Sequence, residues 1–175
     1  MSAGAIGEVL LHTLPDDDPL RGFATQLMID YADLSIAGWM HGSIDAVLRV
    51  PDGSGDHRYL VVDYKTNRLH AIADAGDVAV HAYRPNLLIP AMEHSRYPLQ
   101  ALLYTVAVHR YLRSRLGARY DPEQHLGGVG YLFVRGMVGT ETPSVDGVAH
   151  GVFSWRPPTR TVLALDQLFA TGVVA

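Results

Sequence analysis

The chain contains no cysteine, and this absence narrows the chemistry that it can perform. Without thiolates it cannot form disulfides, a structural zinc site built on cysteines, or an iron–sulfur cluster. It also lacks a Gly-x-x-x-x-Gly-Lys-Ser/Thr sequence, so no ATP site is predicted. The nine histidines are scattered and never form His-Glu-x-x-His, so they do not indicate a zinc enzyme.

Long apolar runs and positive net charge are absent as well. No run of about 18 apolar residues occurs and no basic segment precedes an apolar core at the N-terminus, so the sequence predicts a cytoplasmic protein without membrane association. The net charge of −4 does not favour nucleic acid, because lysines and arginines supply general affinity for phosphates. With 175 residues, 48% of them hydrophobic, the chain is long enough for one globular domain with a sizeable core.

Two neighbouring stretches predict a β-hairpin. Residues 44–50 and 58–65 are rich in β-branched and aromatic side chains, and the segment between them is rich in Pro, Gly and Asp. If the turn is centred on Ser54, antiparallel pairing places Asp45 directly opposite Asp63. A slip of one residue would move Asp45 to the other face of the hairpin.

The two acids and a nearby lysine suggest a metal-dependent hydrolytic site. Facing carboxylates repel unless a cation or a shared proton lies between them. Mg²⁺ accepts such oxygen ligands and usually keeps waters, one of which can be a nucleophile. Asp63 and Lys65 share one strand face while Tyr64 points to the other. A lone Asp-x-Lys more often marks a solvated strand edge, but Asp45 and Asp63 interrupt apolar runs, where burial is costly without compensation.

A helix is predicted downstream. Apolar residues recur with helical spacing over residues 99–116, Pro98 suits the first turn, and Gly117 suits the end. Gln100 and Tyr104 are four residues apart and share one face, where an amide and a phenol can orient a phosphate or the lysine. An ordinary amphipathic helix is the alternative interpretation.

The remaining organisation is less strongly patterned. We predict a weakly patterned, partly helical N-terminal segment at 1–36, with a helix around 23–31, followed by the main domain at 37–175. Residues 68–96 suggest a loop with one short helix. Further predicted elements are strands at 128–134 and 151–155 and a closing amphipathic helix at 161–171.

Arginines gather near the end of the predicted helix. Arg110, Arg113, Arg115 and Arg119 lie within ten residues of one another. A phosphate-contacting patch and a solvated helix terminus that complements the helix dipole are equally compatible with this pattern.

The ordered motifs resemble the C-terminal nuclease domain of the RecB family, the helicase-nuclease subunit of RecBCD (exodeoxyribonuclease V). The resemblance runs over 38–170. It rests on Gly-Ser-Ile-Asp at 42–45, Val-Asp-Tyr-Lys-Thr-Asn at 62–67, Tyr-Pro-Leu-Gln-Ala-Leu-Leu-Tyr at 97–104 and Gly-Gly-Val-Gly-Tyr-Leu-Phe-Val-Arg-Gly-Met at 127–137. The resemblance implies an α/β restriction-endonuclease-like PD-(D/E)xK fold, with a mixed central β-sheet flanked by helices.

The resemblance also implies roles for the site residues. Asp45 and Asp63 would be ligands of Mg²⁺, or of Mn²⁺ as an alternative ion, and the backbone carbonyl of Tyr64 would complete the coordination. Lys65 would activate water or steady the leaving charge. The accessory motif of the family falls on Gln100 and Tyr104.

A further metal ligand is expected upstream, because the family places a histidine on a helix well before the hairpin. His12, with Glu8 four residues earlier on a possible helix face, is the candidate in this chain. It precedes Asp45 by only 33 residues, and Pro15 follows it closely. The alternative is a truncated or shortened relative whose metal site is incomplete.

The function implied by the resemblance is metal-dependent hydrolysis of DNA phosphodiester bonds in recombinational repair. The implied partners are DNA, the RecC and RecD subunits, and RecA. The alternative is a catalytically incomplete nuclease-fold fragment that acts as a docking module for RecC or RecA.

Overall fold

The structure, a computed structural model, describes residues 1–35, 42–69 and 79–174. The strands are β1 (Ala46–Pro51), β2 (His57–Lys65), β3 (Leu126–Phe133), β4 (Ser144–Val145), β5 (Val148–Ala149) and β6 (Val152–Trp155). The α-helices are α1 (Ala3–Thr13), α2 (Arg21–Ile29), α3 (Pro85–His94), α4 (Tyr97–Leu116), α5 (Pro122–His125) and α6 (Thr159–Thr171). Short 3₁₀ helices are η1 (Ala79–Tyr83), η2 (Gly117–Arg119), η3 (Val134–Gly136) and η4 (Gly139–Glu141).

The main sheet is mixed and has the strand order β1-β2-β3-β6. Strands β1 and β2 are antiparallel, β2 and β3 are parallel, and β3 and β6 are antiparallel. This α/β architecture confirms the predicted mixed sheet flanked by helices and is consistent with a PD-(D/E)xK-like arrangement. A separate two-stranded sheet pairs β4 with β5.

The predicted hairpin register is confirmed. Ala46 pairs with Val62, and Val47 pairs with Val61. The ladder starts at Ala46, so continuing it by one residue sets Asp45 beside Asp63. The acid pair therefore stands at the open end of the hairpin, away from its turn.

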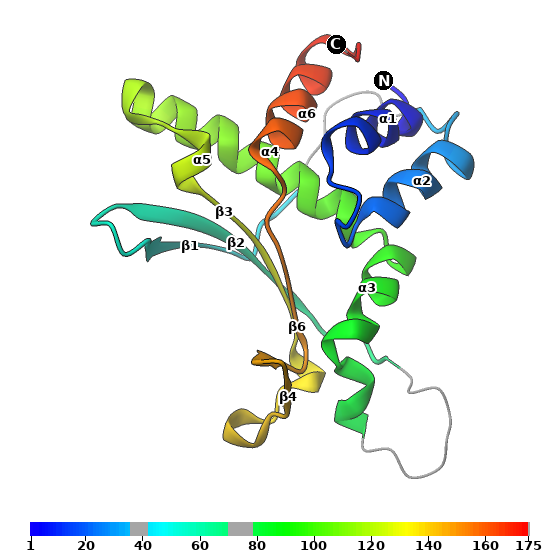
Figure 1. The fold of residues 1–175 in the computed structure, drawn as a ribbon, viewed down its shortest axis with the longest axis vertical. Helices are drawn as coiled ribbons and strands as arrows, with labels where there is room; N and C mark the ends of the chain where they lie inside the picture. Colours follow the sequence, from blue (N-terminus) through cyan, green and yellow to red (C-terminus); the bar gives the residue numbers. More distant parts are fainter. Residues whose placement is uncertain (36–41, 70–78, 175) are drawn as a thin grey trace.

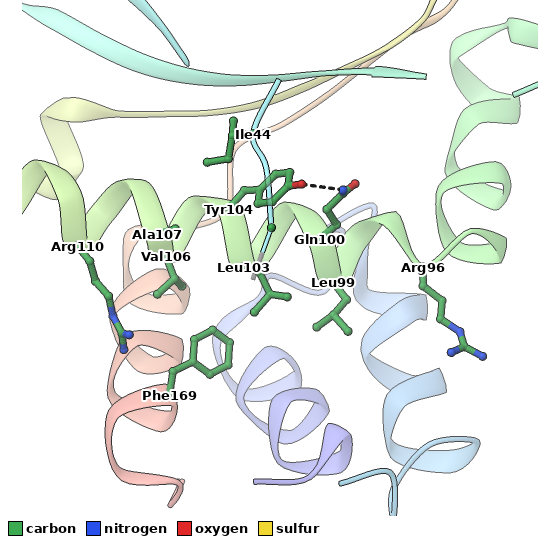
Figure 2. A pocket seen from close by; sticks show the side chains of 11 residues that line it. Ile44, Arg96, Leu99, Gln100, Leu103, Tyr104, Val106, Ala107, Arg110 and Phe169 are labelled. Atoms are coloured by element: carbon green, nitrogen blue, oxygen red, sulfur yellow. Dashed lines mark hydrogen bonds between the residues drawn. The ribbon is translucent and has the colours of Figure 1, made fainter. Parts of the chain in front are cut away.

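Helix α4 forms the layer next to the sheet. Figure 2 shows the sheet on one side of α4, with α1, α2 and α6 on the other side. Figure 1 shows α3 beside the main sheet, toward the end that lies nearest the separate strand β4. One hydrophobic core joins these layers, with Tyr131 and Phe133 from β3, Leu102 from α4, Leu165 from α6 and Ile6 from α1. The N-terminal helices thus share their core with the sheet.

The other predicted elements agree with the structure at most positions. Helix α4 starts one residue before Pro98, and Gly117 caps its end with a φ of 55°. Strands β3 and β6 and helices α2 and α6 lie where they are predicted to within a few residues. The predicted 68–96 loop contains η1 and α3, while residues 70–78 lie outside the described part of the chain. The small β4–β5 sheet was not predicted.

No helix in the described ranges is long and apolar enough to cross a membrane.

Candidate active site

Asp63 and Lys65 form a buried ion pair on one face of β2. Lys65 Nζ lies 2.6 Å from Asp63 Oδ2. Lys65 is only 9% exposed and Asp63 only 3%. The alternation of side chains along the strand explains why residues two apart meet, while Tyr64 between them is half exposed on the opposite face. The predicted shared face is confirmed.

Asp45 stands beside this pair but remains exposed. Its Oδ2 accepts a hydrogen bond of 2.9 Å from the backbone N–H of Tyr64. The β1–β2 ladder begins with Ala46 opposite Val62, so the backbone N–H of Tyr64 lies past its end. The Asp45 carboxylate supplies the acceptor for this N–H. This bond fixes Asp45 next to the end of β2 and leaves its other oxygen open to a ligand.

Gln100 and Tyr104 connect the two ends of the site. Gln100 Oε1 accepts a hydrogen bond of 2.9 Å from Lys65 Nζ. Its Nε2 donates to the Tyr104 hydroxyl at 3.0 Å. That hydroxyl in turn donates to the backbone carbonyl of Ser43, two residues before Asp45. Because lysine can only donate, this network fixes the orientation of the amide and links the lysine to the segment that carries Asp45.

Three residues of the site were not predicted: Tyr97, Tyr131 and Asn67. The Lys65 ammonium lies over both tyrosine rings, and the Tyr97 hydroxyl donates to Asn67 Oδ1 at 2.9 Å. Tyr131 pairs with Asp63 across the parallel β2–β3 ladder. All three residues lie inside the quoted motifs, at 62–67, 97–104 and 127–137, so membership of these motifs was the signal available.

The Tyr131 hydroxyl is held protonated. Burial, together with the negative charge of Asp63, raises the pKa of Tyr131 above its usual range. The hydroxyl therefore acts as a donor, and it bonds Gln100 Oε1 at 3.1 Å. Gln100 Oε1 thus accepts from both the lysine and the tyrosine, which holds it in place.

The donor set of the acid pair fits a hard divalent cation. Asp63 Oδ2 is buried and accepts no hydrogen bond of good geometry from any described residue, although Lys65 neutralises it at close range. Asp45 offers an exposed carboxylate oxygen beside it. Oxygen donors of this kind suit Mg²⁺ or Mn²⁺ rather than thiophilic metals. The role of the Tyr64 carbonyl as a ligand stays a prediction.

His12 does not join the acid pair in this structure. Across residues 1–35, 42–69 and 79–174, no three His, Cys, Asp or Glu side chains cluster in a way that could hold a metal. His12 is exposed near the end of α1, and its Nδ1 lies 2.8 Å from the carbonyl of Glu8 on the same helix. A helix that ends at Thr13 before Pro15 places this histidine at a solvent-facing position instead.

Two arginines of the cluster form ion pairs with a neighbouring helix. Asp166 of α6 accepts hydrogen bonds from Arg110 Nε, at 2.5 Å, and from Arg113 Nη1, at 3.0 Å. Two of the four predicted arginines therefore tie α4 to α6. Arg110 and Arg113 keep 43% and 58% of their side chains exposed in these ion pairs, so the phosphate patch and the solvated terminus both stay predictions.

An apolar cavity of about 590 Å³ opens beside the accessory residues. Figure 2 shows Gln100 and Tyr104 at one side with Ile44, and Leu103 and Phe169 farther from the sheet. Gln100 thus belongs both to the wall of this cavity and to the contact with the lysine.

Comparisons with known proteins give a consistent set of relatives. No protein-family model matches the chain. The RecBCD enzyme subunit RecB of Mycobacterium tuberculosis (strain H37Rv) is 50% identical over 173 residues, which is 98% of this chain and 15% of that protein. RecB of Mycolicibacterium smegmatis is 49% identical over 93% of this chain and 14% of that protein. RecB of Escherichia coli K12 is 39% identical over 78% of this chain and 10% of that protein. The chain therefore spans about a seventh of the length of its mycobacterial relatives, and less of the E. coli protein.

Proposed function

Because this chain belongs to the RecB family, we propose that it is a metal-dependent deoxyribonuclease unit of a RecB-type recombinational repair protein. The observation that carries the proposal is the buried Asp63–Lys65 pair, with Asp45 fixed beside it and Gln100 bonded to the lysine. A surface acid pair needs no such enclosure. This arrangement favours a site in which the two aspartates bind a metal ion and Lys65 contacts the same phosphate group.

Asp45 and Asp63 would hold the metal, Mg²⁺ or Mn²⁺, with the Tyr64 carbonyl as a further oxygen ligand. When bound, the ion polarises the phosphodiester and lowers the pKa of a coordinated water. The residues of the chain do the positioning. The Tyr64 amide holds Asp45, and the burial of Asp63 keeps its carboxylate in a fixed direction.

Lys65 would donate to a nonbridging or leaving phosphate oxygen as charge accumulates there. In hydrolysis, a bond forms between phosphorus and the water oxygen, and the bond from phosphorus to the leaving sugar oxygen breaks. An ammonium at that point stabilises the developing negative charge, which is the type of electrostatic assistance that preorganised donors supply. Gln100 and Tyr104 orient the lysine and the Asp45 segment before substrate arrives.

The partners follow from the proposed family role. DNA is the substrate class, and the name of the relatives points to assembly in a RecBCD enzyme (exodeoxyribonuclease V) with RecC and RecD subunits. Nothing in the site or in the relatives supports RecA as a partner. ATP-driven unwinding is assigned to other parts of such an enzyme, since this sequence carries no phosphate-binding loop.

The first test is hydrolysis of linear single-stranded DNA by the 175-residue chain in Mg²⁺, with Asp63→Ala and Lys65→Ala variants. We expect metal-dependent cutting in the wild type and a loss of about 100-fold or more in each variant. Asp16→Ala is the control, because the Asp16 side chain is 97% exposed and far along the sequence from the site. Circular dichroism and thermal unfolding should show all four proteins folded.

A docking role is the second candidate, and one observation favours it. Within the described residues, the two aspartates gain no third His, Cys, Asp or Glu ligand. A folded wild-type chain that does not cut DNA in Mg²⁺ or Mn²⁺, but binds purified RecC, would replace the nuclease proposal with the docking role. Cutting that survives Asp63→Ala would reject the proposed site altogether.

A further inference from the structure

Lys65 is the only lysine in the sequence; the other 13 of its 14 basic Lys and Arg residues are arginines. It is also buried, which is rare for a lysine unless its charge is compensated. Asp63 compensates the charge as an ion pair, and Gln100 accepts a hydrogen bond. Two aromatic rings also lie close to the ammonium, and the proposed catalytic roles leave them unexplained.

Two tyrosine rings enclose the ammonium. Lys65 Nζ lies 3.8 Å from the centre of the Tyr97 ring and 5.1 Å from the centre of the Tyr131 ring. Both distances are within the range of about 6 Å over which a ring face attracts a cation. The rings stack on each other, with centres 5.8 Å apart and an interplanar angle of 29°. Both rings of this stacked pair therefore lie within cation–π range of one ammonium.

The rings are themselves fixed by their hydroxyl groups. Tyr97 donates to Asn67 Oδ1 at 2.9 Å, two residues beyond the lysine. Tyr131 is fully buried and donates to Gln100 Oε1 at 3.1 Å. Each hydroxyl therefore bonds a residue adjacent to Lys65 in the sequence or in space. A buried hydroxyl needs some partner, and here both partners belong to the site: Asn67 and Gln100.

We propose that Tyr97 is a positioning residue for Lys65, clamped by Asn67 and backed by Tyr131, so that the ammonium meets the phosphate of a DNA strand in one fixed direction. This inference rests on the proposed nuclease function for its catalytic consequence. Lysine has three N–H donors; Gln100 Oε1 accepts one of them, and Asp63 compensates the charge as an ion pair. A ring face stabilises the charge without being a strong acceptor, which leaves N–H donor capacity for a phosphate oxygen.

The geometry can be tested without any activity measurement. Incorporation of lysine labelled with ¹³C at Cε gives a single side-chain signal, because the chain has one lysine. We expect the Cε protons to be shifted upfield by the ring current in the wild type, to be shifted less in Tyr97→Phe, which keeps the ring but loses the hydroxyl bond to Asn67, and to move farthest downfield in Tyr97→Leu. An unchanged shift in a folded Tyr97→Leu protein would overturn the proposal.

Two further variants keep the proposal testable if Tyr97→Leu does not fold. Tyr97→Phe and Asn67→Ala still decide the question, because both retain the ring. Asn67→Ala should leave a smaller, averaged shift, since the ring loses its clamp. A full wild-type shift in Asn67→Ala would reject the clamp.

The catalytic consequence is tested with a double-mutant cycle. We expect Tyr97→Leu to lower kcat about 5- to 30-fold with KM nearly unchanged, and Tyr97→Phe to lower it less, because the ring stays while its bond to Asn67 is lost. In a Lys65→Ala background, Tyr97→Leu should cause no further loss, because the ring acts through the lysine. Equal losses in both backgrounds would mean a structural role and would overturn the proposal. A wild type without activity would reject the nuclease function. The ring-current measurement would still show whether Tyr97 positions Lys65, because it does not depend on activity.

Discussion

Asp45 is the exposed member of the acid pair, so metal binding can be separated from folding at this residue. Its partner Asp63 is buried against the lysine, and replacing it changes the core as well as the ligand set. Among the described residues, Asp45 has one hydrogen bond, from the backbone N–H of Tyr64. An asparagine oxygen can accept the same bond, while it removes the negative charge that a cation requires.

Asp45→Asn should therefore lower metal affinity with little effect on stability. We expect the dissociation constant for Mn²⁺, measured by isothermal titration, to rise about tenfold or more. The unfolding temperature should stay within about 3 °C of the wild type. Asp16→Asn, at a side chain that is 97% exposed, is the control and should change neither quantity. Unaltered Mn²⁺ affinity in Asp45→Asn would remove Asp45 from the ligand set.

Sequence reasoning at the residue scale succeeded where the chemistry is local. The facing acids, the shared face of Asp63 and Lys65, and the shared helix face of Gln100 and Tyr104 follow from strand and helix periods. The contact between Lys65 and Tyr97 does not, because it depends on how α4 packs on the sheet. No spacing rule within one element predicts such a contact.

Strand β3 shows how an element depends on glycine for a close approach. Gly128 has a φ of 93°, in the left-handed region, and a Cβ at this position would lie 2.5 Å from the backbone oxygen of Trp155 on β6. Gly130, two residues later on the same strand, has open space where its Cβ would lie. The two positions offer a matched pair for testing how β3 and β6 meet.

Gly128→Ala should destabilise the fold by about 2–4 kcal/mol, since backbone strain and overlap with Trp155 add. Gly130→Ala should change the free energy of unfolding by less than about 1 kcal/mol. Urea unfolding followed by circular dichroism measures both values. Equal effects of the two substitutions would contradict the described approach of β6 to β3.

Elements with weak local patterns were predicted least precisely: residues 1–36 were expected to be partly helical, with a helix at 23–31 and only a possible helix face at Glu8 and His12. Helix α1 contains Gly4 and Gly7, which disfavour helix in isolation. Packing explains their presence: a Cβ at Gly7 would lie 2.9 Å from the backbone oxygen of Ala24 in α2. The strands β4 and β5 have only two residues each, too few to show an alternating pattern. The hairpin and α4 were predictable because turn residues, caps and periodicity agree there.

At the scale of the whole molecule, a buried polar cluster joins the long helix to the C-terminal helix. His109 of α4 is 2% exposed, and its Nδ1 lies 2.8 Å from the Tyr120 hydroxyl. Its Nε2 lies 3.6 Å from Asp166 of α6, which also bonds Arg110 and Arg113. Burial is the main cause that lowers the pKa of His109; the two arginines add to this, while Asp166 opposes it.

The pKa of Asp166 is lowered as well. Burial alone would raise it, but the hydrogen bond and charge of Arg110 and the charge of Arg113 outweigh that effect. Both groups therefore bind fewer protons in the folded state than in the unfolded state at acidic pH. The stability that neutral His109 contributes is fully present above the ordinary histidine pKa of 6.5 and is lost as the pH falls below it. The stability that ionised Asp166 contributes is lost as the pH falls below the ordinary aspartate pKa of 3.8.

The free energy of unfolding should therefore fall as the pH decreases from 7.5 to 5.5, and His109 should account for part of the slope. One histidine contributes at most about 1.4 kcal/mol per pH unit. Urea titrations at several pH values should show a shallower slope for His109→Gln than for the wild type. His12→Gln removes an exposed histidine outside the α4–α6 contact and should keep the wild-type slope. Identical slopes for His109→Gln and the wild type would mean that protonation of His109 does not contribute to the loss of stability in acid. Other residues would then cause it.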